Sequence, residues 1–289
     1  MKYSRRSFLK TSGAVASGLA LGSLPFLKSC ASPTPEAEYA PFGLQLYTLR
    51  DVIGDDPEGV ITQVAEFGYK QIESYEGRQG MFWGMGNTGF KQFMDDLGMT
   101  MVSTHANVFQ NYEQKVEDLA EIGVPYIVCP FIGDQGSIDA YKEMAETFNR
   151  LGEIANNAGL KFAYHNHAYT FEEMEGEIPQ TVLMDETDPN LVEYQMDIYW
   201  VVAGNADPIE WIRRYPNRFT LSHVKDFART NGDAESVVLG TGTIDFASIL
   251  QVGRENGMIY NLVEQEAYTG TTPIDAVRLN AEYMKELNI

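Results

Sequence analysis

Short runs of apolar residues alternate with amphipathic stretches along most of the chain. Eight of these runs are typical of buried parallel strands, at residues 42–46, 69–73, 100–105, 126–130, 161–165, 192–197, 218–223 and 259–264. Between them, apolar residues recur at helical spacing in residues 58–67, 89–97, 113–122, 138–158, 208–215, 246–256 and 273–287. The pattern therefore predicts an α/β fold that repeats a strand–helix unit.

Five of the expected helices end in a glycine that leads directly into the next strand: Gly68, Gly98, Gly123, Gly159 and Gly257. A glycine at this position adopts the left-handed capping conformation without a steric penalty. Because no long linker interrupts the series, we expect one (β/α)8 TIM barrel over residues 41–289. A doubly wound open sheet is less consistent with the sequence, because residues 44–51 lack the glycine-rich phosphate loop that usually follows its first strand. The polar, glycine-rich residues 76–89 are expected to form a loop.

The N-terminus has the pattern of an export signal. Arg5 and Arg6 precede a small-residue apolar stretch from Thr11 to Phe26, which resembles a twin-arginine (Tat) signal peptide over residues 1–30. An N-terminal anchor helix is the alternative, but the glycine and serine content argues against a permanent membrane span. Residues 27–30 also resemble a bacterial lipobox, which makes Cys30 a candidate for lipidation and a membrane anchor. Residues 31–40 are expected to form a flexible tether, and the mature protein is expected in the periplasm.

The charge of the chain limits its partners. Its formal net charge is −20, and removal of residues 1–30, which hold five basic and no acidic residues, changes it to about −25. Such a surface repels phosphate backbones and anionic lipids, so we expect neither nucleic acid nor direct membrane adsorption. Only Cys129 follows Cys30, so no intrachain disulfide is expected in the mature chain, and Cys129 is expected to be a core residue. The oligomeric state does not follow from the sequence.

All four histidines of the chain stand at or just after the ends of the predicted strands. They are His105, His165, His167 and His223, and the carboxylates in similar places are Glu73, Asp197, Glu264 and Glu266. The C-terminal ends of barrel strands meet at one mouth, where barrel enzymes have their active sites. We therefore expect these side chains to converge.

Two imidazoles and two carboxylates form a ligand set suited to Mn²⁺, Co²⁺, Zn²⁺ or Mg²⁺. Strand alternation directs His165 and His167 to the same side. Any single histidine could instead be a hydrogen-bonded core residue, and Glu73 could form a salt bridge with Arg50 or Arg78. Asp197 and Glu264 follow apolar runs and need a cation, because an unpaired buried carboxylate is costly.

Several segments together resemble the xylose-isomerase-like TIM-barrel superfamily, which includes sugar phosphate isomerases/epimerases, inosose dehydratase and endonuclease IV. They are Tyr-His-Asn-His at 164–167, Met-Asp-Ile-Tyr-Trp at 196–200, His-Val-Lys-Asp at 223–226, Gly-Thr-Gly-Thr-Ile-Asp-Phe at 240–246 and Val-Glu-Gln-Glu at 263–266. The resemblance implies a divalent metal held by Asp197, His223 and Glu264. The fourth family ligand is a glutamate on strand five, where this chain has His165, which favours softer metals than Mg²⁺.

The resemblance also implies a reaction in which a metal polarises the carbonyl of a keto-sugar while a base removes the α-proton to give an enediolate. Glu264 is the candidate base, and His105, His167 and Lys225 are candidates for acid, base or hydroxyl binding. Glu73, Trp200 and Glu266 are candidates for substrate binding. Because the second glutamate of the epimerases is missing, elimination or hydration is favoured over epimerisation.

Export favours an unphosphorylated keto-sugar or glycoside as the substrate. The main alternative is a periplasmic sugar-binding barrel without turnover. A phosphodiesterase like endonuclease IV is disfavoured, because it binds three zinc ions with a larger ligand set and because the charge of this chain repels DNA.

Overall fold

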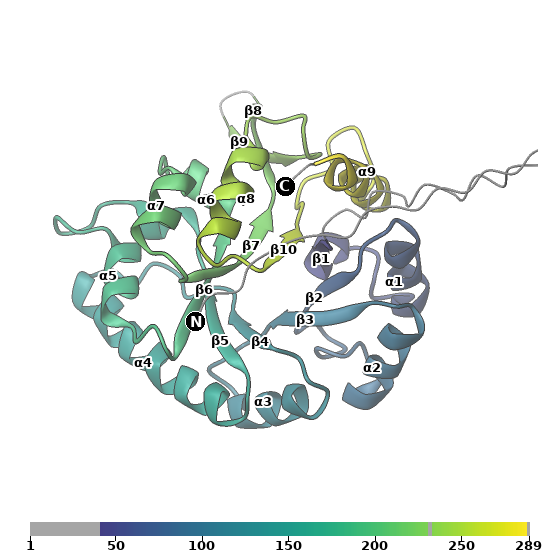
Figure 1. The fold of residues 1–289 in the computed structure, drawn as a ribbon, viewed down its shortest axis with the longest axis horizontal. Helices are drawn as coiled ribbons and strands as arrows, with labels where there is room; N and C mark the ends of the chain where they lie inside the picture. The colour runs from purple at the N-terminus through teal and green to yellow at the C-terminus, as the bar shows by residue number, and fades with distance from the viewer. Residues whose placement is uncertain (1–40, 231–232, 288–289) are drawn as a thin grey trace, which may run out of the picture. The chain divides into compact units, whose positions relative to one another are not determined.

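The computed structural model describes residues 41–230 and 233–287, and its centre is a closed barrel of eight parallel strands (Figure 1). The barrel strands are β1 (Gly43–Gln45), β2 (Gln71–Tyr75), β3 (Thr100–His105), β4 (Tyr126–Cys129), β5 (Lys161–His165), β6 (Val192–Asp197), β7 (Phe219–Val224) and β10 (Tyr260–Val263). Each strand pairs with its neighbours in chain order, and β10 pairs with β1 to close the ring. The predicted barrel and all eight predicted strands are confirmed.

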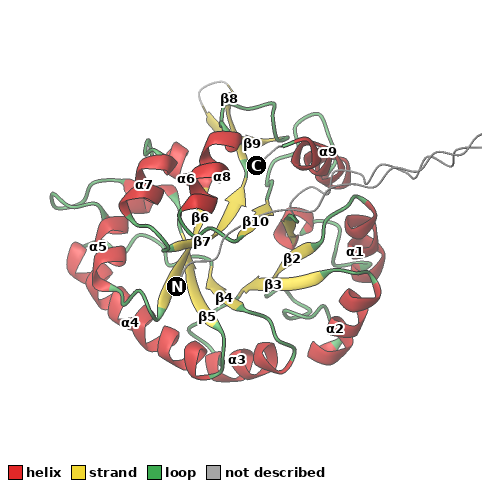
Figure 2. Ribbon diagram, in the orientation of Figure 1, coloured by secondary structure: helices red, strands yellow, loops and turns green. Residues whose placement is uncertain are grey.

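The helices surround the strands (Figure 2). They are α1 (Pro57–Glu66), α2 (Gly86–Asp96), α3 (Tyr112–Glu121), α4 (Ile138–Asn157), α5 (Pro179–Glu186), α6 (Ile198–Ala203), α7 (Pro208–Arg214), α8 (Phe246–Glu255) and α9 (Pro273–Glu286). Two short 3-10 helices, η1 (Leu46–Leu49) and η2 (Ala168–Phe171), follow β1 and β5. The five glycines at the predicted helix–strand joints all have positive φ, from 64° at Gly98 to 103° at Gly68, as expected for left-handed caps.

Two layers of apolar side chains form the core. The larger one lies between the strands and the helices, with Phe162 and Tyr164 as its contribution from β5. The smaller cluster fills the barrel interior and consists of Val102, Tyr126, Val128, Ala163, Leu221 and Leu262. Strand side chains alternate, so the next inward residue of β5 after Ala163 is His165. In the same way, the next inward residue after Leu262 of β10 is Glu264. The polar mouth is thus built directly on the apolar interior.

Three regions differ from the sequence prediction. Helices α5 and α6 were not predicted, and an antiparallel hairpin of β8 (Asp226–Thr230) and β9 (Asp233–Val237) follows β7. The predicted loop at residues 76–89 ends earlier than expected, because α2 begins at Gly86. This loop is also anchored: Trp83 is buried, and its indole N–H donates to the Ser74 hydroxyl at 3.1 Å.

The carboxylate of Asp226 holds both ends of the hairpin. It accepts hydrogen bonds from the backbone N–H groups of Phe227, Gly240, Gly242 and Ile244, at 2.8–3.3 Å. A side chain at residue 242 would collide with this carboxylate, since a Cβ there would lie 2.3 Å from Oδ1 of Asp226. The Gly-Thr-Gly-Thr turn at residues 240–243 therefore packs its backbone closely around the buried carboxylate of Asp226.

The predicted signal peptide, the tether and the lipidation candidate Cys30 lie outside the described residues. Within residues 41–230 and 233–287, no helix is both long enough and apolar enough to cross a membrane. Cys129 is buried in the core, as expected from the sequence.

Candidate active site

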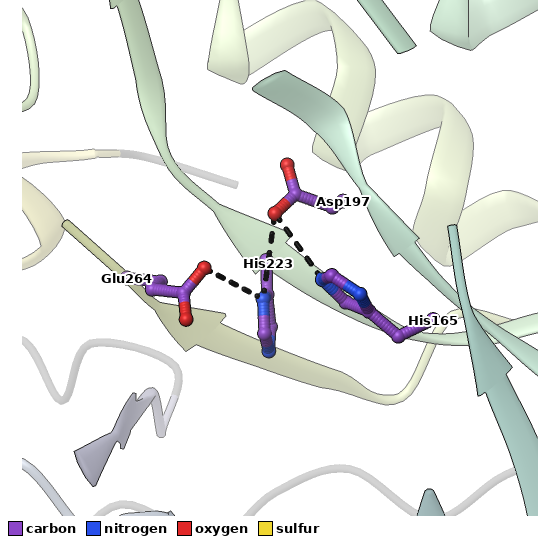
Figure 3. A group of neighbouring side chains, drawn as sticks. All are labelled: His165, Asp197, His223 and Glu264. Atoms are coloured by element: carbon purple, nitrogen blue, oxygen red, sulfur yellow. Dashed lines mark hydrogen bonds and ion pairs between the residues drawn. The ribbon is translucent and has the colours of Figure 1, made fainter. Parts of the chain in front are cut away.

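Four side chains from neighbouring strand ends converge at the mouth of the barrel (Figure 3). His165 ends β5, Asp197 ends β6, His223 belongs to β7 and Glu264 follows β10. Each offers a ligand atom within 4.8 Å of the others, and all four are buried. The predicted convergence is therefore observed, and this group could hold a metal ion.

The carboxylate of Asp197 is oriented by local structure. Asp197 is the last residue of β6 and also the N-cap of α6, so its Oδ1 accepts the backbone N–H of Trp200 at 3.0 Å. Asn166 fixes the backbone of Asp197 through two hydrogen bonds, of 3.1 and 3.2 Å. Oδ2 is left to face His165 Nε2 at 3.3 Å and His223 Nδ1 at 3.6 Å.

The hydrogen-bond partners of the two imidazoles favour a cation between them and the carboxylates. The carbonyl oxygen of Pro130 lies 3.2 Å from His165 Nδ1, so this nitrogen carries the proton and Nε2 presents a lone pair to Asp197. His223 Nδ1 is buried without a hydrogen-bond partner and lies 3.2 Å from Glu264 Oε2. Lone pairs that face carboxylate oxygens repel unless a proton or a metal ion joins them. The donor set therefore fits a divalent metal.

Glu73 is the centre of a second, fully buried network. Its Oε1 accepts hydrogen bonds from Gln45 Nε2 at 2.6 Å and from His223 Nε2 at 2.7 Å, and its Oε2 accepts one from Gln195 Nε2 at 2.8 Å. His105 Nε2 lies 3.1 Å from Oε1. Burial acts to raise the pKa of Glu73, but the two histidines outweigh it and hold that pKa well below its usual range. An ionised Glu73 can only accept, so His223 donates from Nε2 and directs Nδ1 at Asp197 and Glu264. Burial acts to lower the pKa of His223, but the surrounding carboxylates raise it well above its usual value, so Nδ1 carries a proton that a metal ion would have to replace.

Glu73 therefore has a different environment from both sequence-based expectations. It does not pair with Arg50 or Arg78 among the ion pairs of the described residues, and it does not line the cavity in front of the site. Its contacts instead make it an outer partner of His223. His105, which the sequence grouped with the acid/base candidates, lies between this network and the cavity.

Lys225 supplies the nearest positive charge. Its buried ammonium lies 3.2 Å from Glu264 and 3.8 Å from Asp197, and it also pairs with Glu266. Burial alone would lower the pKa of Lys225, but the three carboxylates raise it above its usual value. The ammonium also lies about 5 Å from the ring centres of Tyr199 and Trp200. Lys225 thus keeps its proton and partly neutralises the acidic cluster.

His167 lies beside this cluster among aromatic rings. Its ring centre is 4.9 Å from that of His165 and 5.3 Å from that of Trp200, and its Nδ1 is buried without a partner. Burial and the neighbouring His165 lower the pKa of His167 to about 3. At neutral pH this imidazole is therefore uncharged.

A cavity of about 820 Å³ opens in front of the site. Six of the predicted residues line it, namely His105, His165, His167, Trp200, Glu264 and Glu266. Asp197, His223 and Lys225 lie behind this surface, fully buried. The cavity also has aromatic residues that the sequence reading did not single out, including Tyr47, Tyr75, Phe109 and Phe131.

Comparison with known proteins agrees with the barrel fold. Residues 61–287 match the family model described as xylose isomerase-like TIM barrel. The chain belongs to the xylose isomerase-like TIM barrel family. Residues 2–22 match the twin-arginine translocation pathway signal sequence, which indicates export across the cytoplasmic membrane.

The curated relatives of this family member include inosose dehydratases. The enzyme of Clostridium perfringens is 31% identical over 165 residues, which are 51% of this chain and 55% of the relative. The chain thus spans about half the length of that relative. The inosose dehydratase of Geobacillus kaustophilus is 26% identical over 273 residues and matches 79% of this chain and 86% of its own.

Solved structures share the barrel over nearly its whole length. A sugar phosphate isomerase/epimerase from Parabacteroides distasonis superposes with a TM-score of 0.75 at 27% identity, covering 90% of this chain and 97% of that one. The IOLI protein, whose structure is described with a bound zinc atom, superposes with a TM-score of 0.70 over 86% of this chain and 98% of that one. At 15% identity, the second likeness shows the fold alone.

Proposed function

We propose that this protein is a divalent-metal-dependent lyase or dehydratase that acts on an unphosphorylated keto-sugar or glycoside. The observation that carries the proposal is the convergence of two imidazoles and two carboxylates, within 4.8 Å, at a cavity of about 820 Å³. The inosose dehydratases among the relatives support elimination as the reaction class. In this proposal His165, Asp197, His223 and Glu264 hold the metal, which would be Zn²⁺, Mn²⁺, Co²⁺ or Mg²⁺.

When bound, such a metal polarises the carbonyl of the sugar and makes the neighbouring C–H acidic. Glu264 faces the cavity, and Lys225 and His223 outweigh the effect of burial and lower its pKa, so it is ionised and able to take that proton. The electron pair of the C–H bond then forms a carbon–carbon double bond. The bond from the β-carbon to its oxygen breaks with its electron pair going to that oxygen, which leaves after it accepts the proton that Glu264 removed.

Other side chains of the site could stabilise charge on the substrate and bind its hydroxyl groups. Lys225 retains its proton and lies beside Glu264, so it stabilises negative charge on the substrate oxygens rather than acting as a base. Neutral His167 lines the cavity and can donate a hydrogen bond to the leaving oxygen or bind a hydroxyl. Trp200 presents an apolar surface for the sugar ring, and Glu266 and His105 offer polar contacts.

A histidine in place of a carboxylate at the strand-five position favours elimination over epimerisation. Epimerisation needs a second group that returns a proton to the other face of the same carbon. The strand-five position that would supply a carboxylate holds His165, whose Nε2 is directed at Asp197. One base with a nearby proton donor for the leaving oxygen is sufficient for elimination.

The composition of the cavity disfavours a phosphorylated substrate. Among the residues described, those that line the cavity include no lysine and no arginine, while three are glutamates: Glu76, Glu264 and Glu266. A phosphate group would meet repulsion from these glutamates and would find no lysine or arginine in the lining to bind it. The export signal supports a periplasmic location, where Cys30 would provide an optional lipid anchor.

A sugar-binding barrel without turnover is the alternative, and Lys225 is the observation that favours it. Its ammonium already lies within 3.8 Å of both Asp197 and Glu264, so it could balance their charge without a metal. Such a protein would bind sugars but would exchange no carbon-bound hydrogen.

Metal analysis followed by NMR in D₂O separates the two candidates. We expect the purified protein to contain close to one divalent ion per chain and to exchange the α-hydrogen of a keto-sugar or keto-glycoside. Removal of the metal with a chelator should stop the exchange, and added Mn²⁺ or Zn²⁺ should restore it. Binding of these sugars without exchange, and without any bound metal, would support the binding protein instead.

A further inference from the structure

The cavity is larger than one sugar ring requires. Its volume of about 820 Å³ lies near the upper end of the range, roughly 300–1,000 Å³, that holds drug-sized ligands. The metal-site residues that line it, His165 and Glu264, are buried and define its inner end, whereas its exposed residues define an outer part. The outer part therefore has room for a second group attached to the reacting sugar.

Exposed aromatic rings line this outer part. Tyr47, Phe109 and Phe131 are 38%, 52% and 57% exposed, and all three line the cavity. They follow β1, β3 and β4, so they stand on the same side of the barrel as the site. Only one further large apolar residue among the described ones is comparably exposed, Ile259, which lies just before β10 at the opposite end of the barrel. Exposed apolar groups gathered around a cavity indicate a binding surface, whereas a single one does not.

Ring contacts position two of these three aromatic side chains. Phe131 packs edge-on against His167 and Tyr169, with ring centres 5.1 and 5.7 Å away. Tyr47 packs edge-on against Tyr75 at 5.2 Å, and its backbone N–H donates to the buried Gln45 side chain at 2.9 Å.

The loop that carries Phe109 is fixed by a buried lysine. The Lys115 ammonium donates to the Asn107 carbonyl at 2.8 Å and to Glu76 at 2.7 Å. Glu76 also accepts the Asn107 backbone N–H at 2.8 Å. The exposure of Phe109 is thus a property of a fixed loop. Rigid aromatic surfaces lose little conformational entropy on binding, which makes them efficient ligand contacts.

We propose that Tyr47, Phe109 and Phe131 form an outer subsite for the second ring of a glycoside, which would be an aryl aglycone or a second sugar with an apolar face. This inference rests on the proposed function, because it places the reacting sugar against Trp200 and Glu264. The leaving oxygen would then lie between the two subsites, beside His167. A free monosaccharide would leave the outer subsite unfilled and would bind more weakly.

The test compares probes that share one reacting ring: 3-keto-glucose and the methyl, phenyl and glucosyl 3-keto-β-D-glucopyranosides. A carbonyl at C3 makes the C2 hydrogen acidic and places the glycosidic oxygen on the β-carbon, as the proposed elimination requires. Binding to the full chain is measured by calorimetry, and turnover by NMR on the same samples. We expect the phenyl or the glucosyl probe to bind about tenfold more tightly than the methyl probe. Phe109→Ala and Phe131→Leu should each remove most of this difference and leave affinity for the methyl probe within about twofold. Ile259→Ala, the matched exposed residue at the other end of the barrel, should change neither.

The outcomes separate the subsite from the reaction. A tenfold preference that the two phenylalanine variants remove, without turnover of any probe, would support the subsite and contradict the lyase. Turnover with equal affinities for the methyl, phenyl and glucosyl probes would overturn the subsite and leave the lyase standing. Equal losses for the methyl and phenyl probes in the variants would also overturn it, as would the absence of binding by every probe at 10 mM. A preference for phenyl alone or for glucosyl alone identifies which kind of second ring the subsite takes.

Discussion

His223 donates a hydrogen bond from Nε2 to the buried carboxylate of Glu73 at 2.7 Å, while its Nδ1 faces Glu264 at 3.2 Å. One imidazole thus connects two acidic groups on opposite edges of its ring. Glu73 fixes which nitrogen of His223 donates, and Glu264 belongs to the group of side chains that could hold a metal. Glu73 therefore influences metal binding without touching the ion.

Glu73→Gln should lower the affinity for a divalent metal by about 10- to 100-fold, the usual effect of losing a carboxylate behind a metal-bound histidine. The amide is nearly the same size, so the barrel should remain folded. Calorimetric titration with Zn²⁺ or Mn²⁺ measures the change. Glu193→Gln is the matched control, because Glu193 is also an inward strand carboxylate but binds Tyr126 at 2.7 Å, away from the cluster. Equal affinities in all three proteins would contradict the role of Glu73.

Addition of Mn²⁺, Co²⁺ or Zn²⁺ should raise the melting temperature of the wild-type protein, because a ligand that binds only the native state stabilises it. At a hundred times the dissociation constant, the gain is about 2.7 kcal/mol. Asp197→Ala and His223→Ala should abolish the shift. Glu117→Ala, which changes an exposed acid on α3, should leave it intact. The metal site is disproved if the wild-type protein shows no shift with any of the three ions.

The two histidines at the end of β5 should respond differently to substitution. His165→Glu introduces the carboxylate that the family resemblance implies at this position, and it should retain a metal while shifting the preference toward Mg²⁺ or Mn²⁺. His167→Ala should leave the metal content unchanged and lower kcat by about 10²- to 10⁴-fold, the usual contribution of a positioned acid or base. Metal analysis and turnover of both variants decide the assignment. Loss of metal in His167→Ala but not in His165→Ala would reverse the two roles.

Cys129 should be unreactive although it lines the cavity. Burial raises the pKa of its thiol to about 12, so only about one thiol in ten thousand is ionised at pH 8. In a full-length Cys30→Ser variant, iodoacetamide at pH 8 should label Cys129 only after unfolding, as followed by mass spectrometry. Rapid labelling of the native protein, accompanied by loss of turnover, would instead indicate a nucleophilic cysteine.

Local signals in the sequence were sufficient to predict the barrel fold. The capping glycines, such as Gly68 and Gly257, and the runs between polar stretches mark the strands by themselves. Helix α6 could not be predicted in the same way, because Ile198–Ala203 is apolar throughout and follows β6 without a polar break. The β8–β9 hairpin was missed although Asn231-Gly232, between its strands in sequence, is a pair favoured in tight turns.

Some residues of the candidate site could be predicted from the sequence, and others could not. Histidines and acids at strand ends are visible in the sequence, because strand direction alone brings them to one mouth. Gln45 and Gln195, the polar partners of Glu73, stand inside apolar runs, where a neutral amide gives little indication of its partner. The aromatic side chains around the cavity were also missed. Phe109 and Phe131 resemble core residues in sequence, and only the folded loops determine that they face solvent.

The single carboxylate of Asp226 ties together the two ends of the β8–β9 hairpin. A segment whose ends are held in this way can change in length while β7 and α8 keep their positions. A change in the length of this hairpin should therefore leave β7 and β10, which position His223 and Glu264, in place.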